Sequence, residues 1–155
     1  MKKITFVCLG NICRSPMAEF VMKDLAFKEK FKLEITSAGT SGEHDGEDMH
    51  YKSKSKLQNV GIKAQGFTSK KLTQELCDES DYIVVMDNSN LNNVLRKFQR
   101  VEHKILKMTD FAKELGYNEV PDPWYSGNFD ETYLIISNAC KKLLKALKEE
   151  VVNSP

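Results

Sequence analysis

Short apolar runs alternate with longer amphipathic stretches along the chain. Four runs, at 3–8, 33–37, 82–86 and 104–107, are rich in the β-branched and aromatic residues typical of strands. Between and after them lie stretches in which apolar residues recur every three or four positions, the spacing of one helical face. The pattern predicts a chain in which strands and helices alternate.

The predicted helices are bounded by residues typical of helix ends. Ser15 is a favourable N-cap and Pro16 suits the first position of the first helix. A second helix is expected near 48–60, ending at Gly61, and a third after the polar cluster 87–90. The last helix, about 130–151, carries an apolar stripe opposite several lysines. The stripe comprises Ile136, Ala139, Cys140, Leu143, Leu144, Leu147 and Val151.

Alternating strands and helices indicate the α/β fold class. Right-handed crossovers would make the sheet parallel, with helices on both faces. We therefore expect residues 1–155 to form a single domain around a four-stranded parallel sheet of Rossmann-like type. Ligands of such sheets bind beyond the carboxyl ends of the strands, and Cys8 lies at one of those ends.

The composition limits the function classes. Basic and acidic residues are nearly balanced, 23 against 22, so no overall field would attract nucleic acid or an anionic membrane. The apolar N-terminal run is broken by Asn11 and Arg14, which argues against a secretory signal, and no stretch is long enough to span a bilayer. We expect a cytoplasmic protein with four free cysteines, and the sequence leaves open whether it is also released.

The loop after the first strand has the composition of an anion-binding cradle. Gly10 and Asn11 tolerate positive φ, which allows a tight turn whose backbone N–H groups converge in front of Cys8. The following helix adds its free N–H groups and its positive dipole end. Phosphate or another oxyanion is therefore expected to bind along residues 8–15. The expected contacts are Leu9, Gly10, Asn11, Ile12, Cys13, Arg14 and Ser15.

A thiol in such a cradle is a candidate nucleophile. The N–H groups and the guanidinium of Arg14 should lower the pKa of Cys8 from about 8.5 into the range of roughly 3.5–7.5. Arg14 can bind two phosphoryl oxygens at once. A general acid is available at Asp122, in a stretch stiffened by Pro121 and Pro123, where apolar surroundings would favour the protonated form.

The run Cys8-Leu-Gly-Asn-Ile-Cys-Arg-Ser15 resembles the C-x5-R-S signature of low-molecular-weight protein tyrosine phosphatases. The segments 16–19, 37–39, 86–87 and 121–123 continue the resemblance over nearly the full chain. It implies that phosphotyrosine-containing proteins are hydrolysed through a cysteinyl-phosphate intermediate. Cys8 would be the nucleophile, Arg14 the phosphoryl clamp and Asp122 the general acid and base.

The resemblance also implies roles around this centre. Asn11, Ser15 and Ser37 would hold the loop in shape, and Asp87 would cap a helix and help to orient the acid loop. No metal or organic cofactor is implied, and a monomer or weak dimer is expected. The cleft rim would comprise Leu9, Glu43, His44, Trp124 and Tyr125.

Cysteine and histidine spacing leaves other interpretations open. Cys13 is either a buried residue beside the loop or the partner of Cys8 in a reversible disulfide that protects the nucleophile. Cys77 and Cys140 are expected in the core. Cys8 and Cys13 with His44 and His50 also have the formal spacing of a zinc site, but Arg14 would oppose a cation there.

The residues of this chain favour phosphotyrosine hydrolysis over three alternative functions. Thioredoxin-coupled arsenate reductases share the fold and loop, but they use two further neighbouring cysteines, and Cys77 has no such companion. Phosphoarginine phosphatases typically have threonine where this chain has Ile12, which favours phosphotyrosine. A module that only binds phosphate would lack the nucleophile or the acid, and this chain has both Cys8 and Asp122.

Overall fold

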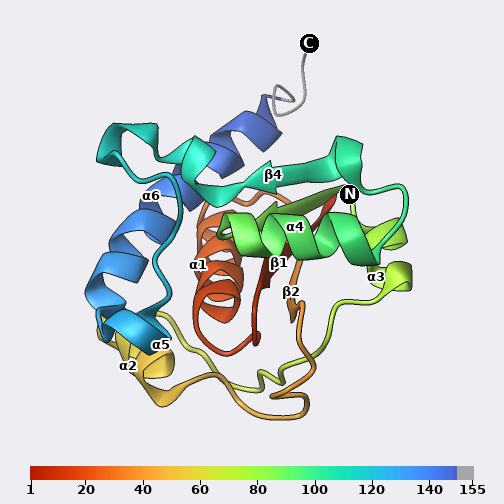
Figure 1. Cartoon of the computed structure of the whole chain (residues 1–155). Coiled ribbons are helices and arrows are strands. Elements are labelled where there is room, and N and C mark those ends of the chain that lie inside the picture. The colour runs from red at the N-terminus through yellow and green to blue at the C-terminus, as the bar shows by residue number, and fades with distance from the viewer. Residues whose placement is uncertain (150–155) are drawn as a thin grey trace.

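Four parallel strands form the centre of the protein, in a computed structural model that describes residues 1–149. The strands are β1 (Lys3–Cys8), β2 (Glu34–Gly39), β3 (Tyr82–Val85) and β4 (Ile105–Lys107), in the spatial order β2-β1-β3-β4. The chain leaves β1 toward β2 and later returns to the other side of β1 with β3. The end of β1 is therefore the switch point at which such sheets bind ligands (Figure 1).

Helices cover both faces of this sheet, as predicted. Alternate side chains of β1 belong to different cores: Ile4 and Phe6 pack with α1 and α6, whereas Val7 packs with α3 and α4. The helices are α1 (Arg14–Lys28), α2 (Tyr51–Asn59), α3 (Gln74–Glu79), α4 (Asn88–Lys97), α5 (Pro123–Ser126) and α6 (Phe129–Lys148). In Figure 1 the loop from β1 to α1 lies in the lower middle of the view, on the side of the molecule where α2 and α5 lie.

All four predicted strands are present, and the predicted helices differ from the structure mainly at their ends. The second helix is shorter than expected, and the turn that follows it has Gly61 at φ +85°. The apolar stripe of α6 is buried up to Leu147, and Val151 lies outside the described residues. No helix within residues 1–149 combines the length and apolar character needed to cross a bilayer.

The prediction for the start of α1 was wrong. The helix begins at Arg14, its N-cap is Cys13, and no side chain caps it. Ser15 lies inside the first turn because its hydroxyl group contacts Cys8 instead of a backbone N–H. Helix α3 was not predicted, since only Cys77 of its six residues is buried and so no apolar stripe marks it.

Candidate active site

The loop between β1 and α1 is held open by hydrogen bonds to its carbonyl groups. The donors are Thr40 N to Cys8 O (3.0 Å), Ser41 N to Leu9 O (2.9 Å), Ser69 Oγ to Asn11 O (2.7 Å), His50 N to Ile12 O (2.7 Å) and Ser53 Oγ to Cys13 O (3.2 Å). Within one peptide unit the N–H and C=O groups point in opposite directions. Because these carbonyls point outward, the N–H groups that follow them point into the loop and converge as an anion would require.

Asn11 fixes the turn of this loop. It is buried and has φ +57°, in the left-handed region that asparagine tolerates better than most residues. Its side chain donates to Ser15 Oγ (2.8 Å) and Ser37 Oγ (3.0 Å) and accepts from Lys70 N (2.9 Å), so both ends of the amide are satisfied. Gly10, in contrast, does not adopt positive φ.

Two glycines allow elements to approach the loop closely. A Cβ atom on Gly10 would lie 3.0 Å from Cδ2 of His44. A Cβ atom on Gly39 would lie 2.7 Å from the Leu9 carbonyl oxygen, 2.9 Å from that of Ser41 and 3.1 Å from the Asn11 nitrogen. The absent side chain at Gly39 therefore lets the end of β2 pack directly against the loop between β1 and α1.

The hydrogen bonds around Asn11 set the direction of donation toward Cys8. Because Asn11 donates to the Ser15 oxygen, the Ser15 hydroxyl is free to donate to Cys8 Sγ, 3.0 Å away. In the same way Ser37 donates to Glu19 Oε1 at 2.6 Å. Cys8 Sγ therefore faces a hydroxyl donor whose orientation is fixed by buried groups.

Glu19 is a site residue that sequence reasoning missed. Its side chain is 8% exposed and is also bonded to Lys23, at 2.6 Å. The sequence gives no sign of this contact, because Glu19 and Ser37 are 18 positions apart and lie on different elements.

Arg14 is almost entirely buried beside the loop. Its guanidinium donates to Asp87 Oδ2 (2.7 Å) and to the Val120 carbonyl (2.9 Å), and it lies 3.5 Å from Asp122 Oδ2. Burial alone would lower the pKa of Arg14, but the charges of Cys8 and Asp87 raise it above its ordinary value. Arg14 is thus a fixed cation in the cleft.

Asp87 makes two contacts, and one of them fixes the Arg14 guanidinium. It caps α4, as predicted, by accepting from Asn90 N at 2.7 Å, and its other carboxylate oxygen binds Arg14. The contact with Arg14 was not predicted. This contact depends on the tertiary structure, because β3 pairs with β1 and its end brings residue 87 next to the start of α1.

Asp122 lies at the N-terminus of α5 and accepts from Trp124 N at 3.0 Å. The expected apolar surroundings are absent, because Trp124 is 55% exposed and Tyr125 is 81% exposed. The nearest charged group is Arg14. The loop is anchored to the sheet by Val120 N, which donates to Met86 O at 2.9 Å.

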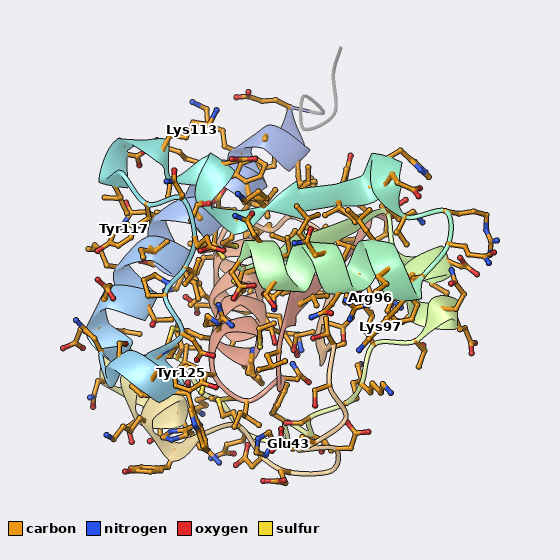
Figure 2. All side chains as sticks on the ribbon, viewed as in Figure 1. Glu43, Arg96, Lys97, Lys113, Tyr117 and Tyr125 are labelled. Atoms are coloured by element: carbon orange, nitrogen blue, oxygen red, sulfur yellow. The ribbon has the colours of Figure 1, made fainter. Side chains whose placement is uncertain are left out.

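The predicted rim residues gather around one cleft. Figure 2 shows Tyr125 on α5 and Glu43 in the loop after β2, so the walls come from distant segments. The rings of His44 and Trp124 lie next to each other at a tilt of 49°, with centroids 6.0 Å apart. The lining residues are Cys8, Leu9, Gly10, Ile12, Cys13, Arg14, Glu43, His44, Asp122, Trp124 and Tyr125.

All four cysteines are free and buried. Burial, and then the charge of Cys8, raises the pKa of Cys13 to about 12. Burial likewise raises the pKa of Cys77 to about 11 and raises that of Cys140. Cys77 and Cys140 are core residues, as predicted.

The residues of the alternative zinc site do not form a set of metal ligands. Within residues 1–149, no group of three or more histidine, cysteine, aspartate or glutamate side chains is arranged to hold a metal ion. His44 contacts Glu47 at 3.2 Å, and His50 caps helix α2.

Comparison with known proteins gives matches over nearly the whole chain. The model of a family described as low molecular weight phosphotyrosine protein phosphatase matches residues 3–153. The low molecular weight protein-tyrosine-phosphatase YfkJ of Bacillus subtilis is 36% identical over 154 residues, which cover 97% of this chain and 98% of the relative.

Solved structures agree with this result. The crystal structure of YfkJ matches with a TM-score of 0.92, covering 97% of this chain and 96% of that one. The solution structure of the low molecular weight protein tyrosine phosphatase from Campylobacter jejuni is 64% identical, with a TM-score of 0.78 and coverages of 96% and 97%. A protein tyrosine phosphatase from Entamoeba histolytica, crystallised with Hepes in the active site, is 34% identical, with a TM-score of 0.91 and coverages of 97% and 99%.

Proposed function

Because the chain belongs to the low molecular weight phosphotyrosine protein phosphatase family, we propose that this protein-tyrosine phosphatase hydrolyses phosphotyrosine in proteins through a cysteinyl-phosphate intermediate. One observation carries the mechanism. Cys8, the inward-facing N–H groups of its loop and the Arg14 guanidinium line a single cleft that also contains Asp122. A nucleophile, an anion cradle and a proton donor therefore act on one phosphoryl group.

In the proposed first step, the Cys8 thiolate attacks phosphorus. The sulfur–phosphorus bond forms as the bond to the tyrosyl oxygen breaks, and Asp122 donates its proton to the leaving oxygen. A bound dianion that pairs with Arg14 places negative charge beside the Asp122 carboxyl group, which favours its protonated form during this step. The loop N–H groups and Arg14 stabilise the charge on the equatorial phosphoryl oxygens.

In the second step, the Asp122 carboxylate accepts a proton from water as the water oxygen attacks phosphorus. Inorganic phosphate forms and the Cys8 thiolate leaves. The Ser15 hydroxyl, 3.0 Å from the sulfur, stabilises this leaving thiolate, and Asn11 and Ser37 keep that hydroxyl oriented. All groups used in these steps belong to the chain itself.

The cleft rim accommodates the phenyl ring and the flanking peptide. We assign the ring to the walls formed by Leu9, Trp124 and Tyr125, whose exposed aromatic surfaces favour stacking. Glu43 and His44 also line the cleft, and we assign to them the contacts with residues that flank the phosphotyrosine.

Cys13 is proposed to protect the nucleophile. Hydrogen peroxide would convert the Cys8 thiolate to a sulfenic acid, and attack by the Cys13 sulfur would form a disulfide and release water. The raised pKa of Cys13, about 12, predicts slow closure as long as the loop keeps its shape.

The decisive experiment compares substrates. Peptides carrying phosphotyrosine, phosphoserine or phosphoarginine are incubated with the wild type and with Cys8→Ser, and released phosphate is measured. We expect hydrolysis of the phosphotyrosine peptide alone, and none by Cys8→Ser. Preferred hydrolysis of phosphoarginine, or activity that survives in Cys8→Ser, would refute the proposal. A trapped phosphoenzyme that disappears in the same variant would support the covalent step.

A further inference from the structure

His50 connects three parts of the active site. Its backbone N–H donates to the Ile12 carbonyl at 2.7 Å, which fixes one peptide unit of the anion-binding loop. Its ring nitrogen Nδ1 accepts from Lys52 N at 3.1 Å and so caps helix α2. The ring also packs against Phe129 at the start of α6 and edge-on against Trp124, with centroids 5.1 and 5.7 Å apart.

These contacts link the loop that binds phosphate to the loop that carries the acid. Trp124 follows Asp122 by two residues, and its backbone N–H is bonded to the Asp122 carboxylate. The position of the His50 ring therefore affects both the aromatic wall of the cleft and the start of α5. The same residue controls the outward direction of the Ile12 carbonyl.

The cap formed by His50 depends on its protonation state. A neutral imidazole has one nitrogen acceptor, whereas an imidazolium has two N–H donors and no acceptor. The side chains that cap α3, α4, α5 and α6 are Thr73, Asp87, Asp122 and Asn128, which keep an acceptor oxygen at every pH near neutrality. Helix α2 is thus capped by a group that titrates in the physiological range.

The surroundings favour the neutral ring. Burial, and then the positive charge of Lys52, lowers the pKa of His50. Carboxylates on the neighbouring elements each lie within ion-pair distance of another side chain. The pairs are Glu47 with His44, Asp48 with Lys54, Asp122 with Arg14 and Asp130 with Lys56.

We propose that His50 is a positioning residue: its backbone N–H holds the anion-binding loop, while its neutral ring caps α2 and packs against Trp124 of the acid loop. Protonation of the ring removes the cap and so loosens this connection. The catalytic part of this inference rests on the proposed role of Asp122. The structural part does not, because the cap and the ring contacts exist independently of the reaction. Because the pKa of His50 is lowered from its ordinary value of about 6.5, the ring is neutral and the connection is intact at pH 7. The connection is lost as the pH falls below about 6.5 and the ring becomes protonated.

Trp124 provides a direct reporter, because it is the single tryptophan of the chain. A protonated imidazole quenches a neighbouring indole, so its emission should follow the ionisation of His50. His44 is also close to Trp124, and His44→Gln tells the two histidines apart by fluorescence.

Two variants separate the functions of the ring. His50→Asn keeps an acceptor for Lys52 N at every pH but removes the ring, whereas His50→Phe keeps a ring but removes the acceptor. Thr73→Ala is the matched control, since it deletes the cap of α3. Emission and kcat for an aryl phosphate are measured from pH 5 to 8 at saturating substrate.

In the wild type we expect an emission transition below pH 6.5 that persists in His44→Gln and is absent from His50→Asn. His50→Phe should already lose about fivefold in kcat at pH 7.5, the scale of one lost helix cap, and Thr73→Ala should keep the wild-type kcat. A transition that persists in His50→Asn, or full kcat in His50→Phe, would overturn the inference. If no protein hydrolyses the aryl phosphate, the proposed function fails, and the emission of His50→Asn still decides whether His50 is coupled to Trp124.

Discussion

Replacing Gly39 by alanine tests whether backbone packing behind the loop sets catalytic geometry. The added Cβ would lie 2.7 Å from the Leu9 carbonyl oxygen and 2.9 Å from that of Ser41, closer than real contacts allow. Both obstacles are backbone atoms, so no side-chain rotation relieves the clash. The Leu9 carbonyl must move by several tenths of an ångström, and its hydrogen bond from Ser41 N moves with it.

Gly39→Ala should lower both the stability of the protein and its kcat/KM. Overpacking of this kind destabilises proteins by about 1–3 kcal/mol. A misplacement of 1 Å in an active site can cost about 10²-fold in rate, so we expect kcat/KM to fall by about tenfold or more. With roughly 2–4 °C of melting temperature per kcal/mol for a chain of this size, Tm should fall by about 2–12 °C.

The assay measures Tm and the kcat/KM for an aryl phosphate in Gly39→Ala and in Gly116→Ala. Gly116 has φ +81° and open space around its hypothetical Cβ, so its substitution adds backbone strain far from the cleft. We expect Gly116→Ala to lower Tm while keeping the wild-type kcat/KM. Unchanged kcat/KM in Gly39→Ala would refute the idea that this close approach shapes the cradle.

Three further substitutions test the proposed proton donor Asp122, the second loop cysteine Cys13 and the buried carboxylate of Glu19. Asp122→Asn should lower kcat by about 10²- to 10⁴-fold for leaving groups of high pKa and much less for activated ones, and equal losses for both would argue against a general acid. Cys13→Ser should leave initial activity intact but prevent recovery by thiol after peroxide treatment, because Cys8 then lacks a disulfide partner; full recovery would contradict this role. Glu19→Ala removes the acceptor of Ser37 and should destabilise the protein by about 1–3 kcal/mol in denaturant unfolding, with kcat reduced; an unchanged midpoint would show that the buried hydrogen bond contributes nothing.

The local pattern of the sequence was sufficient for the fold class. The β-branched runs mark all four strands, and the stripe of α6 marks a helix with one buried face. These signals depend on residues close together in the chain, so they can be read without tertiary information. Short elements such as α3 bury too little surface to leave a pattern.

The same limit explains the corrections at the site. Ser15 has the character of an N-cap, but its hydroxyl group is drawn to Cys8 and Asn11 by the tight loop. Asp122 was expected in apolar surroundings, yet its neighbours Trp124 and Tyr125 are largely exposed and Arg14 is the nearest charge. In both cases a contact from another segment outweighs the local preference.

The sequence by itself determined the order of the four strands and the longer helices, the position of Cys8 at a strand end and the six-residue spacing to Arg14. Only the tertiary structure decided that Asp87 holds Arg14, that Glu19 supports the donor chain to Cys8 and that His50 joins two loops. The reason is physical: periodicity and turn preferences act between neighbours, whereas these contacts arise when strand order brings distant segments to the same edge of the sheet.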